Sequence, residues 1–127
     1  MASIYLYFNA FLYLLFSLWC LFKPTETATS LGYSFLNNNG KIEYTAVYAG
    51  MEFGFAAFFA ICGFYVQFKT AGLIFAVCMY TGLVLTRVFS ALMLGGLSKT
   101  TYIIGGLELL LFITGLVLLT GCMKKGL

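Results

Sequence analysis

The sequence contains no histidine and very few charged residues. Of its 127 residues, 7 are Lys or Arg and 4 are Asp or Glu, so that charged residues make up 9% of the chain. A soluble domain averages about 25% charged residues, and this chain therefore has too few to cover a water-facing surface. Without histidine, the common haem, zinc and general-base arrangements lose their usual side chain. The composition excludes an ordinary soluble domain and disfavours a metal or haem cofactor.

The sequence also lacks motifs of catalysis and of nucleic-acid binding. Its 4 cysteines lie apart without Cys-x-x-Cys spacing, which predicts small packing residues and not a redox or metal site. There is no Gly-rich phosphate loop and no nucleophile motif. The net charge of +3 is scattered, and no basic run with interleaved aromatics indicates nucleic acid. We therefore expect a protein that is not an enzyme, uses no cofactor and binds no nucleic acid.

Apolar residues fill 62% of the chain and gather in long runs at about residues 3–22, 44–67, 71–97 and 101–122. About 20 apolar residues suffice to cross the ~30 Å hydrocarbon core of a bilayer. The first run lacks the basic start and the cleavage pattern of a signal peptide, so we interpret it as a retained helix. The two short connections favour antiparallel neighbours. The predicted fold is an all-α integral membrane protein, a single antiparallel four-helix transmembrane bundle over residues 1–127.

Residues 23–43 are predicted to form the one substantial connection. Pro24 is suited to open a short interfacial helix that ends near Thr29. Residues 37–40, Asn-Asn-Asn-Gly, are a turn signal suited to positive φ. A connector that rests on the bilayer is the simpler interpretation, and a functional loop is the alternative, because long loops in small domains are often functional.

Three ionisable residues lie inside the apolar runs: Glu52 in the second, Arg87 in the third and Glu108 in the fourth. Such residues cost ~2.5–3.5 kcal/mol each even on insertion scales, and they nearly always face the bundle interior and pair with one another. A rise of 1.5 Å per residue places all three roughly 10–15 Å below the membrane face that carries the long connection. We therefore predict an intramembrane polar cluster of Glu52, Arg87 and Glu108.

The charges of this cluster do not balance. Two carboxylates and one guanidinium leave an excess negative charge, so either one glutamate keeps a proton or a cation or a water-filled pocket offsets the charge. One interpretation is a static cluster that fixes the register of the helices. The other is a site that handles protons or a ligand.

Small residues along one side of the predicted helices indicate close packing. Gly50 and Gly54 form a Gly-x-x-x-Gly motif in the second run, and Gly105 and Gly115 share a stripe with Glu108 in the fourth. The first run carries a packed face of mixed polarity at helical spacing, made of Asn9, Tyr13, Phe16, Ser17 and Cys20.

The residues around the three charges resemble those of a known family. They are Tyr-Ala-Gly-Met-Glu-Phe-Gly at residues 48–54, Thr-Arg-Val-Phe-Ser at 86–90 before Gly95-Gly96, and Leu-Glu-Leu at 107–109. The chain resembles small bacterial four-helix membrane proteins of the domain-of-unknown-function family 4345, which is similar to the DoxX-like group. The resemblance covers about residues 44–120, and the Asn-rich residues 34–41 depart from it. It implies a four-helix fold with an intramembrane arginine at Arg87, and it implies no established activity.

We expect a small non-enzymatic integral membrane protein that forms a homo-oligomer or acts as an accessory or structural subunit of a larger membrane complex. The small-residue stripes and the 14 glycines favour this function. The alternative is a transporter or receptor of protons, lipid or small apolar molecules that uses the polar cluster. Membrane lipid is a partner in either case. We expect a bacterial inner-membrane protein with both termini in the cytoplasm, although the lysines divide evenly between the two faces.

Overall fold

The computed structural model describes residues 1–126, which form helices joined by short connections. In chain order the helices are α1 (Ala2–Phe22), α2 (Pro24–Leu31), α3 (Asn38–Thr45), η1 (Ala46–Met51), α4 (Glu52–Phe64), η2 (Val66–Phe68), α5 (Lys69–Leu94) and α6 (Lys99–Gly126). The segment η1 is a π-helix and η2 is a 3-10 helix. The described residues contain no strand, which confirms the predicted all-α class.

Four helical stretches within residues 1–126 are long and apolar enough to cross a membrane: Ala2–Phe22, Asn38–Phe64, Val66–Leu94 and Lys99–Gly126. The four predicted spans are thus confirmed, with shifted bounds. The second span begins at Asn38 and not at Tyr44, because α3, η1 and α4 follow one another without a break. The chain has the architecture of a small helical membrane protein.

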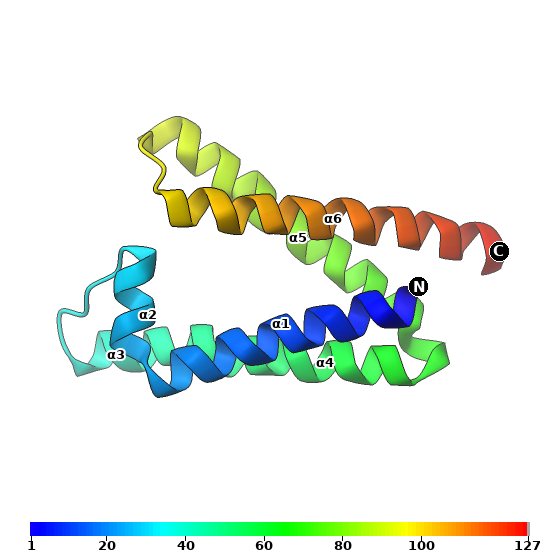
Figure 1. Ribbon diagram of the computed structural model, residues 1–127, viewed down its shortest axis with the longest axis horizontal. Coiled ribbons are helices and arrows are strands. Elements are labelled where there is room, and N and C mark those ends of the chain that lie inside the picture. The colour runs from blue at the N-terminus through cyan, green and yellow to red at the C-terminus, as the bar shows by residue number, and fades with distance from the viewer. Residues whose placement is uncertain (127) are drawn as a thin grey trace.

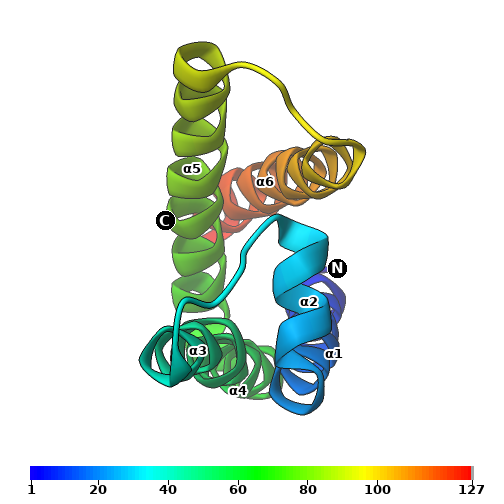
Figure 2. The same ribbon diagram turned by 90° about the vertical axis from the view of Figure 1, so that its left-hand side faces the viewer.

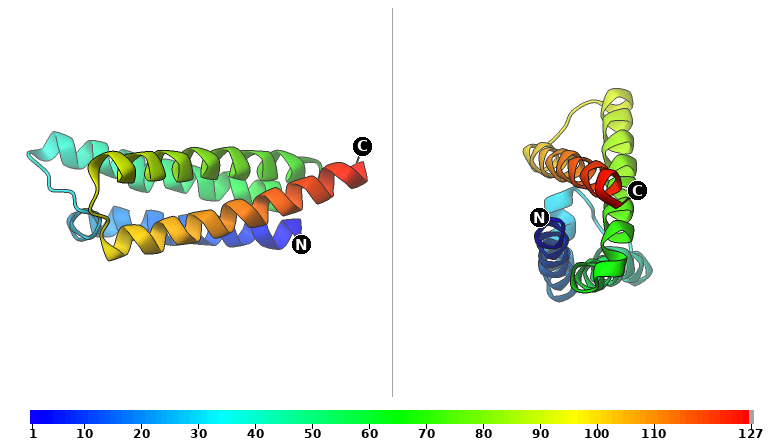
Figure 3. Two further views of the ribbon diagram at one scale, coloured as in Figure 1. Left: turned by 90° about the horizontal axis from the view of Figure 1, so that it is seen from above. Right: turned by 90° about the vertical axis from the view of Figure 1, so that its right-hand side faces the viewer.

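The long helices form two pairs, α1 with α4 and α5 with α6 (Figure 1). In Figure 1, α1 and α5 run from right to left, whereas α4 and α6 run from left to right. Figure 2 looks from the end that carries α2 and α3, and it shows α5 inclined steeply to the other long helices. Figure 3 shows the N-terminus and the end of α6 together at the opposite end. Because α5 is inclined, the two pairs meet near the termini and diverge toward α2 and α3.

The apolar core lies where the two helix pairs meet. Its buried side chains are Tyr5, Leu6, Phe59, Cys62, Leu73, Ala76, Tyr80 and Leu111. Helix α5 approaches α4 closely at Gly72, where a Cβ atom would lie 2.7 Å from the Cβ of Cys62. A larger residue at this position would force the helices apart. Glycine at position 72 therefore allows the start of α5 to pack tightly on the end of α4.

The connection after α1 is more helical than predicted. Pro24 opens α2, as expected, and Gly32 ends it with a φ of +89°. Asn37 has an extended backbone, and its side chain accepts a hydrogen bond of 2.9 Å from the Gly40 amide, which is the N-cap of α3. The predicted turn at residues 37–40 is wrong, since none of these residues has positive φ and α3 already begins at Asn38. The Asn-rich segment begins a helix instead.

Helix α5 ends earlier than predicted, so the link between α5 and α6 is longer. Helix α5 ends at Leu94 and not at residue 97, because Gly95 and Gly96 adopt φ values of +67° and +64°, which are costly for other residues. After this break, the Ser98 hydroxyl accepts a hydrogen bond of 3.2 Å from the Thr101 amide at the start of α6.

Candidate functional site

The divergence of the helix pairs leaves a cavity of about 410 Å³ between them. This volume lies within the usual range for small-molecule sites, roughly 300–1,000 Å³. One part of the lining is apolar and comes mainly from Leu12, Phe16, Leu83, Ile104, Leu107 and Leu111. The other part is polar and comprises Tyr13, Tyr33, Tyr48, Glu52, Tyr80, Arg87, Thr101 and Glu108. All three predicted cluster residues therefore line one cavity.

Arg87 on α5 donates hydrogen bonds to both carboxylate oxygens of Glu108 on α6. Its Nε donates to Oε2 at 2.9 Å and its Nη2 donates to Oε1 at 2.8 Å. The Arg87 side chain is 31% exposed and the Glu108 side chain is 12% exposed. A bidentate pair of this kind fixes geometry as well as adding energy. The pair links α5 to α6 at the wall of the cavity.

Gly105 makes room for this ion pair. It precedes Glu108 by one turn of α6, and a Cβ atom at Gly105 would lie 3.0 Å from the Cδ of Arg87. The arginine side chain therefore lies across the face of α6 that glycine leaves bare. Gly105 thus lies in close contact with a neighbour, as its predicted packing role requires, and that neighbour is the Arg87 side chain.

Glu52 does not join the ion pair. It lies on α4, which belongs to the other helix pair than Arg87. Residues 1–126 contain no ion pair between Glu52 and a basic side chain. Its Oε2 atom is buried and has no hydrogen-bond partner among the described residues. The predicted bonded cluster of three is therefore corrected to one ion pair and one separate carboxyl group. Glu108 receives the two hydrogen bonds of Arg87 because α6 packs directly on α5, whereas Glu52 belongs to the other helix pair.

The inner end of the cavity is closed by a buried polar network that joins three spans. Tyr80 on α5 donates its hydroxyl to the side-chain oxygen of Asn9 on α1. Asn9 in turn donates to the Tyr5 carbonyl at 2.8 Å, and the Tyr5 hydroxyl donates to the Leu111 carbonyl on α6 at 2.8 Å. Asn9 is fully buried. The predicted packed face of α1 is confirmed here, whereas the contribution of Tyr5 was not recognised from the sequence.

Tyrosines cover the opposite end of the cavity, next to α2. The hydroxyls of Tyr33 and Tyr48 lie 2.8 Å apart in a hydrogen bond, and the rings of Tyr44 and Tyr48 stack with centroids 4.5 Å apart. The sequence signal that could have revealed the stacked pair is the spacing of Tyr44 and Tyr48, which places both rings on one side of a helix. It gave no indication that Tyr33, across the connection, would meet them.

The π-helix η1 immediately precedes Glu52 and carries Tyr48. The Ser17 hydroxyl of α1 donates to the Ala49 carbonyl in η1 at 2.7 Å, and so it supplies a hydrogen bond from outside the helix. Single turns of π-helix occur frequently at functional sites, because the wider turn changes the register of the side chains around it. No pattern in the sequence indicated this local change of helix type.

The four glycines predicted to pack between helices divide into two groups. A Cβ atom at Gly115 would lie 2.6 Å from the Tyr5 hydroxyl oxygen, so Gly115, like Gly105, permits close contact. A Cβ atom at Gly50 or Gly54 would have no other atom within 4 Å. Gly50 and Gly54 therefore make no close helix contact within this chain, and their predicted packing role stays a prediction. Gly72, described above, and Gly63 are packing glycines outside the Gly-x-x-x-Gly motif.

The cavity has acidic, phenolic and guanidinium groups but no cluster suited to a metal ion. Within residues 1–126, no three His, Cys, Asp or Glu side chains gather closely enough to hold one. The cysteines are free, and Cys20 and Cys62 are buried packing residues. The site can bind a molecule through Glu52 as an acceptor and through an apolar wall.

The fold and this set of polar groups define a small helical membrane protein with a cavity between its spans. The chain belongs to the family described as Domain of unknown function (DUF4345), whose model matches residues 1–119. The match confirms the resemblance to this family that was recognised from the sequence, and it extends the resemblance to the first span and to the connection after it. Neither the curated proteins nor the solved structures that were compared with the chain gave a match.

Proposed function

We propose that this protein is a non-catalytic membrane receptor or carrier that binds a small amphipathic molecule in the cavity between its two helix pairs. The ligand would have an apolar body and a head group that donates a hydrogen bond, such as an alcohol, a phenol or an ammonium group. The observation that carries the proposal is Glu52, a residue that lines the cavity and whose buried Oε2 atom has no hydrogen-bond partner within residues 1–126.

A buried polar atom without a partner is rare in folded proteins and calls for an explanation. Arg87 does not serve Glu52 in this structure: its Nε and Nη2 donate to Glu108, and within residues 1–126 it makes no ion pair with Glu52. The excess negative charge expected from the sequence therefore belongs to Glu52. In our proposal, the donor head group of a ligand, or a proton, neutralises Glu52 and supplies the missing hydrogen bond.

The rest of the cavity favours an amphipathic ligand over a fully polar one. Leu83 on α5 and Leu107 on α6 face the same space as Glu52, so a ligand that reaches the carboxyl group also lies against apolar side chains. Burial of that apolar body would supply most of the binding energy, at roughly 25 cal/mol per Å². The hydrogen bond to Glu52 would select among apolar molecules by their head group.

The test is photolabelling of the full chain in lipid nanodiscs with a long-chain alcohol that carries a diazirine. We expect the label on the peptides that line the cavity and competition by unlabelled 1-dodecanol. Glu52→Leu removes the acceptor and should reduce labelling about tenfold, the factor that corresponds to a hydrogen bond with a charged group. Leu83→Trp fills the cavity and should reduce labelling in the same way.

Glu26→Leu is the matched control, since Glu26 is an exposed carboxylate on α2 that pairs with Lys23. This variant should label like the unaltered protein. Label spread evenly over the outer faces of the spans, or unchanged labelling of Glu52→Leu, would refute the proposal.

The second candidate function is assembly, either with copies of itself or as a subunit of a larger membrane complex. It is favoured by α6, a helix of 28 residues of which Leu111 and Gly115 are the buried ones. Gly106 on α6 is open, with no atom within 4 Å of its Cβ position. Gentle detergent extraction should then give a species larger than one chain, and Gly106→Trp should reduce it. A clean monomer at native abundance, with no co-purifying protein, would exclude this candidate.

A further inference from the structure

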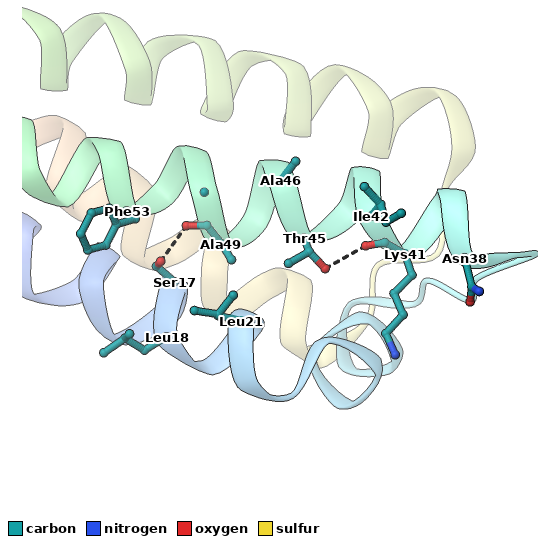
Figure 4. A pocket seen from close by; sticks show the side chains of 11 residues that line it. Ser17, Leu18, Leu21, Asn38, Lys41, Ile42, Thr45, Ala46, Ala49 and Phe53 are labelled. Carbon is teal, nitrogen blue, oxygen red and sulfur yellow. Dashed lines mark hydrogen bonds between the residues drawn. The ribbon is translucent and has the colours of Figure 1, made fainter.

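A second hollow lies on the outside of the bundle, between α1 and the continuous helix of α3, η1 and α4 (Figure 4). Its volume is about 850 Å³, and it shares no lining residue with the central cavity. The side chains beside it are open to the surroundings, with Leu21 50%, Ile42 64% and Phe53 55% exposed. The groove therefore lies on the outer face of the bundle, the face that would contact the lipid chains of the bilayer.

The interior of this groove is suited to a hydrocarbon chain. Small residues, Ala46 and Gly50, leave its floor open. The hydroxyls that line it are already used within the chain, since Ser17 donates to the Ala49 carbonyl at 2.7 Å and Thr45 donates to the Lys41 carbonyl at 2.8 Å. Figure 4 draws both hydrogen bonds. The groove thus presents an apolar surface along its length.

One end of the groove is polar and positively charged. Figure 4 shows Asn38 and Lys41 at the start of α3 and Phe53 at the opposite end. The Lys41 side chain is exposed and makes no ion pair within the described part of the chain. A lysine at the end of a span lies at the level of the lipid head groups, where it attracts anionic lipids.

The length of the groove distinguishes a lipid from a helix. Lys41 and Phe53 are 12 positions apart, which is roughly 18 Å of helix at 1.5 Å per residue. That is close to one leaflet, half of the ~30 Å hydrocarbon core. The residues that line the groove end at Phe53, so its length matches one acyl chain, whereas a membrane-crossing helix of a second copy would span both leaflets.

We propose that this groove binds an anionic phospholipid of the leaflet on the side of α2 and α3. The lipid phosphate would pair with Lys41, and one acyl chain would lie over Ala46 and Gly50 as far as Phe53. Charge complementarity at Lys41 and the single-leaflet length carry this assignment. It is independent of the central cavity and of the ligand proposed there.

The test is native mass spectrometry of the full chain, purified with phosphatidylglycerol or with phosphatidylcholine of the same acyl length. The unaltered protein should retain phosphatidylglycerol about fivefold better, as one lysine at a membrane surface would produce. Lys41→Gln should abolish this preference. Ala46→Leu and Gly50→Leu should each reduce retention of phosphatidylglycerol, because both side chains would enter the path of the acyl chain.

Two control variants match these changes. Lys124→Gln removes an exposed lysine near the end of α6, and Gly54→Leu adds the same side chain at an open glycine that does not line the groove. Both should retain lipid as the unaltered protein does, and glycerol 1-phosphate, which lacks acyl chains, should not displace it. Equal retention of the two lipids, an unchanged preference in Lys41→Gln, or a dimer that Gly50→Leu dissociates without loss of lipid would overturn the proposal.

Discussion

Arg87 on α5 and Glu108 on α6 are joined by two parallel hydrogen bonds, of 2.9 Å from Nε to Oε2 and 2.8 Å from Nη2 to Oε1. Within residues 1–126 this is the one ion pair that links two spans. It lies in the part of the molecule where the two helix pairs diverge, so it ties α5 to α6 while leaving Glu52 on α4 for other contacts. The consequences for stability and for binding can be tested separately.

The ion pair should make Arg87→Leu strongly destabilising. Loss of the guanidinium leaves Glu108 buried without a counter-charge. We expect a loss of about 2–4 kcal/mol in the free energy of unfolding, somewhat below the range for fully buried pairs, since the Arg87 side chain is 31% exposed. Denaturant titration in mixed micelles measures this loss. The double variant Arg87→Leu with Glu108→Leu should recover most of the stability, and a double variant that is no more stable than the single one would contradict this account.

Glu52→Leu should have the opposite effect on stability. It replaces a buried carboxyl group that lacks a partner with an apolar side chain of similar size. We expect the free energy of unfolding to rise by about 1–2 kcal/mol, within the cost of an unsatisfied buried polar group. The same titration measures the change, and Glu26→Leu on the exposed surface should leave stability unaltered. A destabilised Glu52→Leu protein would mean that Glu52 has a structural partner.

Two glycines of α6 should respond differently to the same substitution. In Gly115→Ala the added Cβ would lie 2.6 Å from the Tyr5 hydroxyl oxygen, which would displace the hydrogen bond from Tyr5 to the Leu111 carbonyl. We expect a loss of about 1–3 kcal/mol, as in other overpacked cores. Gly121→Ala, with no atom within 4 Å of its Cβ position, should be neutral or up to about 1 kcal/mol stabilising. Thermal unfolding in detergent compares the two variants.

The orientation in the membrane can be tested with a chain from which the native cysteines have been removed. Asn38 lies at the α2–α3 end, and Gly126 lies at the end that carries the termini (Figure 1). If both termini are cytoplasmic, a membrane-impermeant thiol reagent should label Asn38→Cys in intact cells, and Gly126→Cys only after permeabilisation. The reverse pattern would place the termini outside.

Local sequence determined the number of spans and the chemistry available to them. Apolar runs of about 20 residues are recognisable because the bilayer imposes a fixed length on a helix. Pro24 was a reliable signal for the start of α2, since the ring of proline suits the first turn. Arg87 stood out because a charged residue inside an apolar run almost always pairs with another polar or charged group. The depth of Glu52, Arg87 and Glu108 followed from helical rise alone, and it correctly placed all three around one cavity.

The tertiary structure decided which of these groups meet. Depth along a helix is a one-dimensional quantity, whereas contact also depends on how the helices are inclined, and Figure 2 shows α5 inclined to the other long helices. Arg87 pairs with Glu108 on the neighbouring α6 and not with Glu52 on α4. Likewise, a glycine pattern indicates that a helix can approach a neighbour closely, but it does not identify the neighbour. Gly105 and Gly115 turned out to face neighbours, while Gly50 and Gly54 make no close contact within this chain, because the rotation of a helix about its axis is set by the packing of its partners.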